Sequence, residues 1–399
     1  MELIIKDINI KELKDYLAIF NALSLDSRPD GLNSYLLYRG EDSSLNLLLK
    51  NSLTFATIRL ECTILNKENF SVDWGLYINN TMLSFIVNSY QEEQLSSMIW
   101  KIGEKETSYF KISAAGDNLS LPNMGITTSN IIELKDLILS EGVHEKQFSL
   151  SSLGNQKDDF LTGLGDCSNF LLEDEGKGNA IAIYKDRMVT SDRRQVFIYQ
   201  MNEPVSCISE ENPYFLHKRN QKIILTILKK NIEGQDISFS EDQKKLWIEA
   251  KNFFAVISNS LASIVPPSNE DLVKISPTER VATMSISTLL ETAMFLQGFY
   301  LSGMDVHPIM IETIPGQGIK FVLQHTGVAN QHSCNFERMI STDISNESII
   351  SIKILNDSLL KFLKISQGDE NTTLFLDNDH IASLFETPKR KIFLAKLKG

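Results

Sequence analysis

Apolar residues recur along this chain with two different periods. Six windows show the three- and four-residue spacing of an amphipathic helix, namely residues 10–23, 81–95, 151–164, 217–231, 285–301 and 355–365. In the first window Leu13, Leu17 and Phe20 share one face, and Tyr16 lies next to them. Such a stripe is typical of a helix that lies with one face on a sheet.

Short runs rich in β-branched, aromatic and aliphatic residues lie between these windows, bounded by Gly, Asn, Asp or Ser. They are residues 58–65, 110–114, 180–184, 196–201, 246–250, 319–324 and 373–376. Runs of this kind predict strands in antiparallel hairpins. Two helices, each followed by several strands, recur about every 130 residues, which predicts three similar copies of one α+β unit.

Proline-rich segments indicate where two of these units meet. Pro266, Pro267 and Pro277 fall in a stretch where a continuing helix or central strand would not tolerate them. We therefore expect three domains, at residues 1–125, 146–274 and 275–399. Residues 126–145 form either a linker or an ordered insertion, and the sequence leaves both possibilities open.

The charge of the chain limits its class of function. Its 399 residues include 39 Lys and Arg against 51 Asp and Glu, a formal net charge of −12. Such acidity excludes a protein that coats nucleic acid by bulk charge, although it allows a local basic strip. No run approaches the about 18 apolar residues of a spanning helix, and the N-terminus lacks an apolar signal core. The four cysteines are scattered singly, as in reduced proteins, so we expect a cytoplasmic protein.

Signatures of catalysis and of metal or cofactor binding are missing from the sequence. It contains no P-loop, no dinucleotide-binding glycine motif, no nucleophile elbow and no zinc-protease motif. Of the six histidines only His325 and His332 lie near each other, and no further residue completes a set of metal ligands. We therefore expect no enzyme, no cofactor and no metal. An enzyme on a duplicated α+β scaffold stays the alternative.

One predicted helix departs from the acidic average. Residues 217–231 contain five cations and no acid, namely Lys218, Arg219, Lys222, Lys229 and Lys230. Ile223, Leu225, Ile227 and Leu228 supply its apolar side. The six helical windows together carry ten cationic and eight acidic residues, an excess opposite in sign to that of the whole chain. The helix is either a basic binding face or an ordinary solvated amphipathic helix.

Several segments carry the motifs of one family. Val189-Thr190-Ser191-Asp192 forms a strand followed by a turn, and His217-Lys218-Arg219 is the basic start of a helix. Further matching segments are residues 246–273, 287–300, 352–364 and, in the first domain, 109–114. In this order they resemble the bacterial DNA polymerase III β sliding clamp, in a divergent form from a bacterium or a bacteriophage.

The resemblance implies the DNA clamp fold, in which three similar domains, each with two helices on antiparallel sheets, assemble into a ring. It implies a processivity factor that encircles double-stranded DNA without sequence specificity and tethers the replicative polymerase. An acidic body with mildly basic inward helices suits this role, because it tolerates DNA inside the ring without gripping it. The residues expected to face the DNA are Lys11, Lys14, Lys218, Arg219, Lys222, Lys229, Lys230, Lys361 and Lys364.

The resemblance also implies a crevice between the second and third domains that binds short peptides of the polymerase and the clamp loader. The matching positions are Ser191, Arg193, Arg194, Val196, Pro267, Leu272, Ile392, Phe393 and Leu394. Arg193-Arg194 and the C-terminal residues 392–397 depart from the family pattern. We therefore expect an altered peptide preference, for a more acidic motif.

Finally, the resemblance implies a head-to-tail homo-oligomer that closes along the strand at residues 109–114. Phe110 and Ile112 would then meet Phe299 and Tyr300 of a second copy, which hides exposed strand edges. The alternative is that these residues pack within the core of one subunit. We expect a homodimer. The sequence leaves open a trimeric ring and a monomeric interaction scaffold derived from a clamp.

Overall fold

The computed structural model describes residues 2–24, 34–39, 44–50, 53–66, 75–90, 99–103, 109–114, 116–121, 146–171, 180–192, 194–230, 232–259, 267–299, 308–325, 334–345, 349–377 and 381–397. The chain forms two compact units. Unit 1 consists of Met1–Gly154 with Lys222–Ser260, and unit 2 of Asn155–Gln221 with Leu261–Gly399. The predicted insertion at 126–145 lies outside the described residues, and the three domain boundaries stay a prediction.

The helices follow the periodicity of the sequence closely. Within the described residues they are α1 (Ile10–Ser24), α2 (Asn80–Ser89), α5 (Lys157–Ser168), α6 (Lys218–Lys230), α7 (Asn269–Ile275), α8 (Ile286–Gln297) and α9 (Asn356–Ile365). All six predicted windows are confirmed as helical, although α2 ends at Ser89 because Tyr90 is extended. The third window starts with a 3₁₀ turn that is kinked at Gly154. The seven-residue helix α7, which Ser268 caps, was not predicted because it is too short to show a period.

The strands form four antiparallel sheets. They are β1 (Glu2–Lys6), β2 (Ser34–Arg39), β3 (Leu45–Lys50), β4 (Thr54–Leu60), β5 (Thr63–Leu65), β6 (Gly75–Asn79), β7 (Ile99–Gly103), β8 (Tyr109–Ala114), β9 (Asp117–Leu121), β10 (Lys146–Ser149), β11 (Ala180–Ile183), β12 (Arg187–Ser191), β13 (Gln195–Gln200), β14 (Tyr214–His217), β15 (Asp236–Ser240), β16 (Lys245–Ala250), β17 (Phe253–Ser258), β18 (Arg280–Ser285), β19 (Pro308–Ile314), β20 (Gly318–His325), β21 (Cys334–Ile340), β22 (Ser351–Leu355), β23 (Asn371–Phe375), β24 (Ala382–Glu386) and β25 (Arg390–Ala395). The run predicted at 58–65 is two strands, β4 and β5. The turn at residues 316–318 joins β19 to β20, and Gly316 has a positive φ of 74° there.

The strand pairing repeats three times along the chain. In each repeat a strand leads into a first helix, three strands form a meander, a further strand leads into a second helix, and three strands close the unit. The meanders are β2–β4, β11–β13 and β19–β21, and their first strands pair with β6, β14 and β22. The leading strands β1, β10 and β18 pair with β7, β15 and β23. The predicted repetition of one α+β unit is confirmed by this topology.

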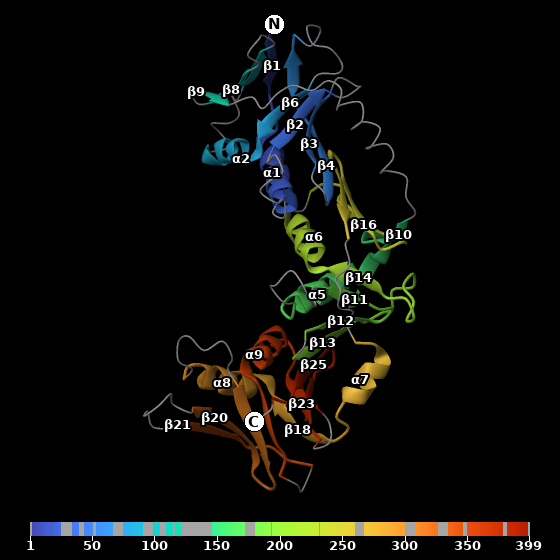
Figure 1. Ribbon diagram of the computed structural model, residues 1–399, viewed down its shortest axis with the longest axis vertical. Coiled ribbons are helices and arrows are strands. Elements are labelled where there is room, and N and C mark those ends of the chain that lie inside the picture. The colour runs from blue at the N-terminus through green and yellow to red at the C-terminus, as the bar shows by residue number, and fades with distance from the viewer. Residues whose placement is uncertain are drawn as a thin grey trace. The chain divides into compact units, whose positions relative to one another are not determined.

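The sheets continue from one repeat into the next. In unit 1, β17 of the second repeat pairs with β4 of the first, which makes one eight-stranded sheet. In unit 2, β25 of the third repeat pairs with β13 of the second in the same way (Figure 1). Among the described strands, the equivalent pair β9 and β21 lack this continuation, and both lie at the edges of their sheets.

The helices pack one face on these sheets, and the first helices of the three repeats align by their buried residues. Leu13, Phe160 and Leu289 are equivalent, and so are Leu17, Leu164 and Ala293, all of them buried. In two repeats a side-chain amide of the second helix donates a hydrogen bond to the backbone carbonyl of the second of these positions, Leu164 or Ala293. Gln221 Nε2 lies 3.0 Å from Leu164 O, and Asn356 Nδ2 lies 3.0 Å from Ala293 O.

Candidate functional site

The predicted basic helix is α6, and its cations lie on the side away from the core. Ile223, Ile224 and Ile227 are buried, whereas Lys222, Lys229 and Lys230 are exposed and Lys218 and Arg219 are half-buried. The helix contains no acidic residue. Its surface therefore carries a row of positive charge, as the sequence predicted.

The cations of α6 differ in how they are paired. Lys230 Nζ lies 3.1 Å from Asp15 Oδ1 of α1, so part of its charge is neutralised within unit 1. No ion pair joins Lys222 or Lys229 to another residue in the described part of the chain. These two lysines are therefore the most available to an anionic partner.

The other predicted DNA-facing residues also lie on helices. Lys11 is exposed on α1, and Lys14 is half-buried there and donates to the carbonyl of Tyr90 at 3.1 Å. Lys361 and Lys364 are exposed on α9. Glu12 and Asp15 balance the two lysines of α1, so α6 and α9 carry the positive excess. Whether these residues surround one opening stays a prediction.

An apolar cluster of unit 2 contains part of the predicted peptide site. Val196 of β13, Leu272 of α7 and Phe393 of β25 are buried in it together with Ala182, Tyr184, Val189, Ile198, Ala382 and Leu384. Phe215, Ile275 and Phe375 pack against it and stay partly exposed. Three residues of the predicted site, one each from β13, the connector and the C-terminal strand, thus lie in one cluster, and their role in peptide binding stays a prediction.

Two predicted members of this site lie elsewhere. Ile392 and Leu394 are buried, but neighbouring residues of a strand point to opposite faces, so they lie on the other face of β25 from Phe393. Ile392 pairs with Phe197, whose ring stacks on Phe170, two residues after the end of α5. These two residues therefore belong to the helix-side core, which corrects their place in the predicted site.

The remaining residues of the predicted peptide site form its polar part. Ser191 and Pro267 are half-buried, and Arg194 is exposed at the turn between β12 and β13. Asp192 shapes this turn, because its Oδ1 accepts from the backbone N–H of Arg194 at 2.6 Å. Arg193 lies outside the described residues.

The predicted closure strand β8 is not a sheet edge. It pairs with β7 on one side and with β9 on the other, so the edge of this sheet is β9. Phe110 is 1% exposed and Ile112 0%, and Phe110 packs edge-on against Trp100. Both side chains are core residues of their own sheet, as in the alternative considered from the sequence. Phe299 is half-buried and stacks on Phe336 of β21, whereas Tyr300 lies outside the described residues.

Exposed apolar side chains accompany the two open edges. Met82 and Phe85 of α2 are exposed in the repeat that ends with β9, and Phe85 is 72% exposed. Met294 and Phe295 of α8 and Met339 of β21 are exposed in the repeat that contains the other edge. Sequence reasoning missed these residues, because they lie among the apolar positions of predicted helices and strands and look like core.

In the described part of the chain, features of a metal site or a membrane-spanning segment are not found. Within the described residues no group of three His, Cys, Asp or Glu is placed to hold a metal ion. Among the same residues no helix has the length and apolar character needed to cross a membrane.

The three repeated α+β units, each with two helices, define a fold that the chain shares with solved sliding clamps. The chain has the fold of the DNA polymerase III β sliding clamps, which confirms the resemblance seen in the sequence at the level of fold. Comparison of sequences alone does not detect this similarity in fold, because no family model and no curated protein matches the chain.

Particular solved structures show how close the similarity is. The DNA polymerase III subunit beta from Pseudomonas aeruginosa is 13% identical, with a TM-score of 0.69 and full coverage of both chains. The pol III beta of Caulobacter crescentus is 12% identical, with a TM-score of 0.72 and full coverage of both chains. A putative beta subunit from Eubacterium rectale has a TM-score of 0.71 at 12% identity, over all of this chain and 99% of the other.

Proposed function

We propose that this protein is a non-enzymatic sliding clamp, which closes into a ring around duplex DNA and tethers a replicative polymerase. The observation that carries the proposal is that β9 and β21 are sheet edges among the described strands. The strands equivalent to them at the two junctions within the chain pair with each other in continuous sheets. The similarity in fold to DNA polymerase III beta subunits supports it.

Ring closure would extend the sheet pattern of the chain to a second copy. If β9 of one copy paired with β21 of the next, the five-stranded and the four-stranded sheet would join into one sheet of nine described strands, in which β9 and β21 are no longer edges. The two edges belong to different surfaces, so the contact is head-to-tail, and it gives a closed ring when the rotation between copies closes. Two copies would supply six repeats. Met82 and Phe85 beside one edge, and Met294 and Phe295 beside the other, would become buried at this contact.

A direct image of the particle tests the proposal. Electron micrographs of the purified protein should show an annulus with an open centre. Protein that has closed around nicked circular DNA should stay bound in high salt. It should dissociate after a double-strand cut makes the DNA linear. A solid particle, or equal loss from circular and linear DNA, would refute the proposed function.

The lysines of α6 should supply the weak electrostatic contact with DNA. Replacing Lys222 and Lys229 with glutamine should lower the salt dependence of duplex binding, measured by fluorescence anisotropy at low salt. Each lost phosphate contact reduces the slope of log K against log salt by about 0.9, so the double variant should lose about 2.

A matched control separates this effect from net charge. Lys244 is exposed in the turn between β15 and β16 and belongs to no helix. Its replacement by glutamine removes a positive charge and should leave the salt slope unchanged. An unaltered slope in the Lys222→Gln, Lys229→Gln variant would exclude α6 from the DNA contact.

The apolar cluster around Val196, Leu272 and Phe393 should receive the peptides of the polymerase and the loader. Arg194 is exposed on the turn next to Val196, whereas Asp271 of α7 is engaged in capping its own helix. We therefore expect an acidic peptide to bind several-fold more tightly than its neutral counterpart in a fluorescence titration, and Arg194→Glu to abolish the difference. Arg280→Glu, on the far edge of the same sheet, is the matched control. Equal affinity of the two peptides for the unaltered protein would exclude the preference.

A further inference from the structure

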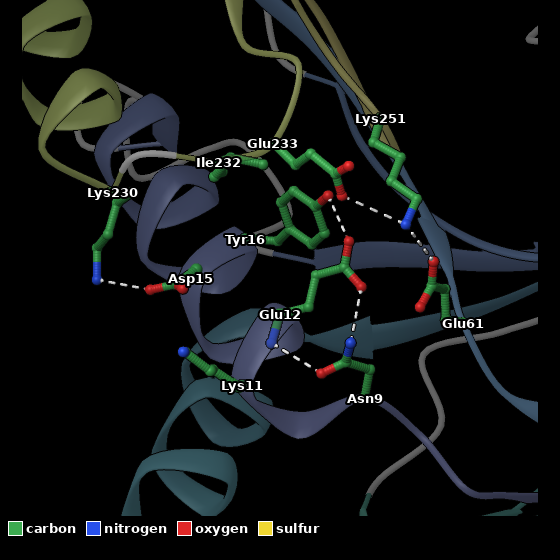
Figure 2. A pocket seen from close by; sticks show the side chains of 10 residues that line it. All are labelled: Asn9, Lys11, Glu12, Asp15, Tyr16, Glu61, Lys230, Ile232, Glu233 and Lys251. Atoms are coloured by element: carbon green, nitrogen blue, oxygen red, sulfur yellow. Dashed lines mark hydrogen bonds and ion pairs between the residues drawn. The ribbon is translucent and has the colours of Figure 1, made fainter.

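The first and second repeats meet in unit 1 at a half-buried carboxylate. Glu12, the third residue of α1, accepts a hydrogen bond from the hydroxyl of Tyr16 at 2.7 Å through its Oε1 (Figure 2). The same oxygen accepts from Asn252 Nδ2 at 3.0 Å. Asn252 belongs to the turn between β16 and β17, and its carbonyl accepts from the N–H of Arg59 at 2.8 Å. The same amide also donates to Glu61 Oε1 at 2.9 Å. Glu12, together with Glu61, therefore holds the incoming turn where the two repeats share a sheet.

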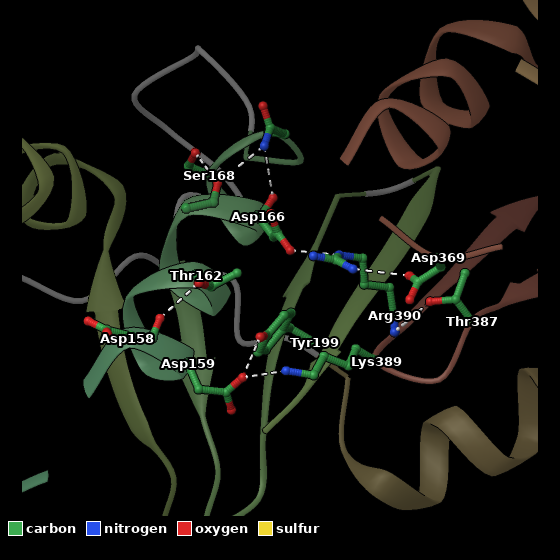
Figure 3. Close-up of polar contacts among 12 residues, drawn as sticks. Asp158, Asp159, Thr162, Asp166, Ser168, Tyr199, Asp369, Thr387, Lys389 and Arg390 are labelled. Atoms are coloured by element: carbon green, nitrogen blue, oxygen red, sulfur yellow. Dashed lines mark hydrogen bonds and ion pairs between the residues drawn. The ribbon is translucent and has the colours of Figure 1, made fainter. Parts of the chain in front are cut away.

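The second and third repeats meet in unit 2 with the same arrangement. Asp159, the third residue of α5, accepts from the hydroxyl of Tyr199 at 2.7 Å and from Lys389 Nζ at 2.8 Å (Figure 3). Lys389 lies in the turn between β24 and β25, and its carbonyl accepts from the N–H of Gln200 at 2.8 Å. The acid, the tyrosine hydroxyl and the incoming turn thus occur at both junctions.

The two tyrosines come from different positions of the repeat. Tyr16 is the seventh residue of α1, and the seventh residue of α5 is Gly163. Tyr199 reaches Asp159 from strand β13, and a β-carbon at Gly163 would lie 2.7 Å from its ring atom Cδ1. The ring of Tyr199 therefore takes up space that only a glycine leaves free. A phenol has reached an equivalent carboxylate from two separate positions, so the contact is not merely inherited from a common repeat.

The third repeat has no such group. The positions equivalent to Glu12 and Tyr16 are Thr288 and Thr292 of α8. The hydroxyl of Thr292 donates to the carbonyl of Thr288, within its own helix. In the described residues the carboxylate contact is thus confined to the junctions inside one chain.

We propose that these two contacts are latches that hold successive repeats together within the chain. The latch of unit 1 consists of Glu12, Tyr16 and Asn252, and the latch of unit 2 of Asp159, Tyr199 and Lys389. Each latch ties the first helix of one repeat to the closing hairpin of the next, beside the last hydrogen bond of the shared sheet. Loss of a latch turns its junction into a local hinge.

The protonation states suit this role. Burial raises the pKa of both Tyr16 and Tyr199, and the neighbouring acid raises it further, so both hydroxyls stay protonated and donate. Burial raises the pKa of Asp159, but hydrogen bonds from Lys389, from the N–H of Asn202 and from Tyr199 outweigh it and leave the pKa lowered. Asp159 is therefore a charged acceptor at neutral pH, the stronger kind of hydrogen-bond partner.

Hydrogen–deuterium exchange of the native protein, read by mass spectrometry, tests the latches. Asp159→Ala should speed exchange of the Gln200 amide by about tenfold to a hundredfold and leave that of Arg59 unchanged. Glu12→Ala should do the reverse. Tyr199→Phe, which removes only the hydroxyl, should also speed exchange of the Gln200 amide. This variant keeps the test valid if Asp159→Ala fails to fold.

Two control variants complete the experiment. Asp158→Ala removes a neighbouring acid from the same helix N-terminus, and Thr288→Ala alters the equivalent position of the third repeat; neither should change exchange at Gln200 or Arg59. Unchanged exchange at Gln200 in both Asp159→Ala and Tyr199→Phe would overturn the proposal. So would equal acceleration at both junctions, which would indicate general destabilisation. The readout lies within one chain, so it is independent of ring closure and DNA.

Discussion

Glutamate in place of either Phe85 or Phe295 is expected to keep the protein monomeric at a concentration at which the unaltered chain forms closed rings. Phe85 is 72% exposed on α2, and Tyr90, which follows α2, donates a hydrogen bond to Asp117 of the edge strand β9. Phe295 is 44% exposed on α8, and Arg338 of the other edge strand, β21, lies over its ring. A carboxylate at the centre of an apolar contact would be desolvated without a partner, which should weaken association by about a hundredfold or more. Sedimentation velocity measures the result directly.

Mixing the two variants tests the polarity of the contact. Each variant retains one intact surface, so Phe85→Glu and Phe295→Glu should together form open dimers through the two unaltered surfaces, and never rings. Ile349 is as exposed as Phe85 and lies before β22, outside both surfaces, so Ile349→Glu should assemble like the unaltered protein. A mixture that stays monomeric would contradict the head-to-tail arrangement. A monomeric unaltered protein would favour the clamp-derived scaffold.

Arg390→Ala is expected to lower the free energy of unfolding of unit 2 by about 3 kcal/mol, because it leaves two largely buried carboxylates without their partner. Arg390 Nε lies 2.8 Å from Asp166 Oδ2, and its Nη1 lies 3.1 Å from Asp369 Oδ2 (Figure 3). The arginine side chain is only 12% exposed. Denaturation in urea, followed by a probe placed in unit 2, measures the loss. Lys391→Ala breaks a more exposed pair with Glu386 and should cost less than about 1 kcal/mol.

The pH dependence of this variant has a definite sign. Burial raises the pKa of Asp166, and the hydrogen bond and charge of Arg390 lower it, so removal of the arginine should raise it further. A carboxyl whose pKa is raised by folding favours the folded state when protonated. The stability lost in Arg390→Ala should therefore be partly recovered as the pH falls through the raised pKa of Asp166. A loss of stability that is constant across this range would contradict the buried, unpaired charge.

The spacing of apolar residues predicted the helices, because each helix buries one face and the residues of that face recur every three or four positions within one continuous segment. The stripe of Leu13, Leu17 and Phe20 and the cations of α6 lie as the sequence indicated. Helix α7 was not predicted, because its seven residues span too few turns for a period to appear. Part of the peptide site was misplaced because Ile392 and Leu394 point away from Phe393, and strand alternation could have shown this.

The surface proposed for ring closure could be located only from the order of the strands in the sheets. Residues 109–114 read as a strand, but whether a strand is an edge depends on its neighbours, and β9 covers β8. Phe85 and Phe110 are both phenylalanines in apolar segments, and one is exposed whereas the other is buried. Exposure depends on what packs against a residue, and that information is spread over the chain.

By itself the sequence determined the threefold repeat, the helix positions and the basic face of α6, because these follow from spacing and charge along consecutive residues. Tertiary structure alone decided which strands are left as edges, which apolar residues stay exposed, and how Glu12 meets Asn252 or Asp159 meets Lys389. The physical reason is that such pairs are separated by more than two hundred residues, and only the closing of the sheets brings them within hydrogen-bond distance.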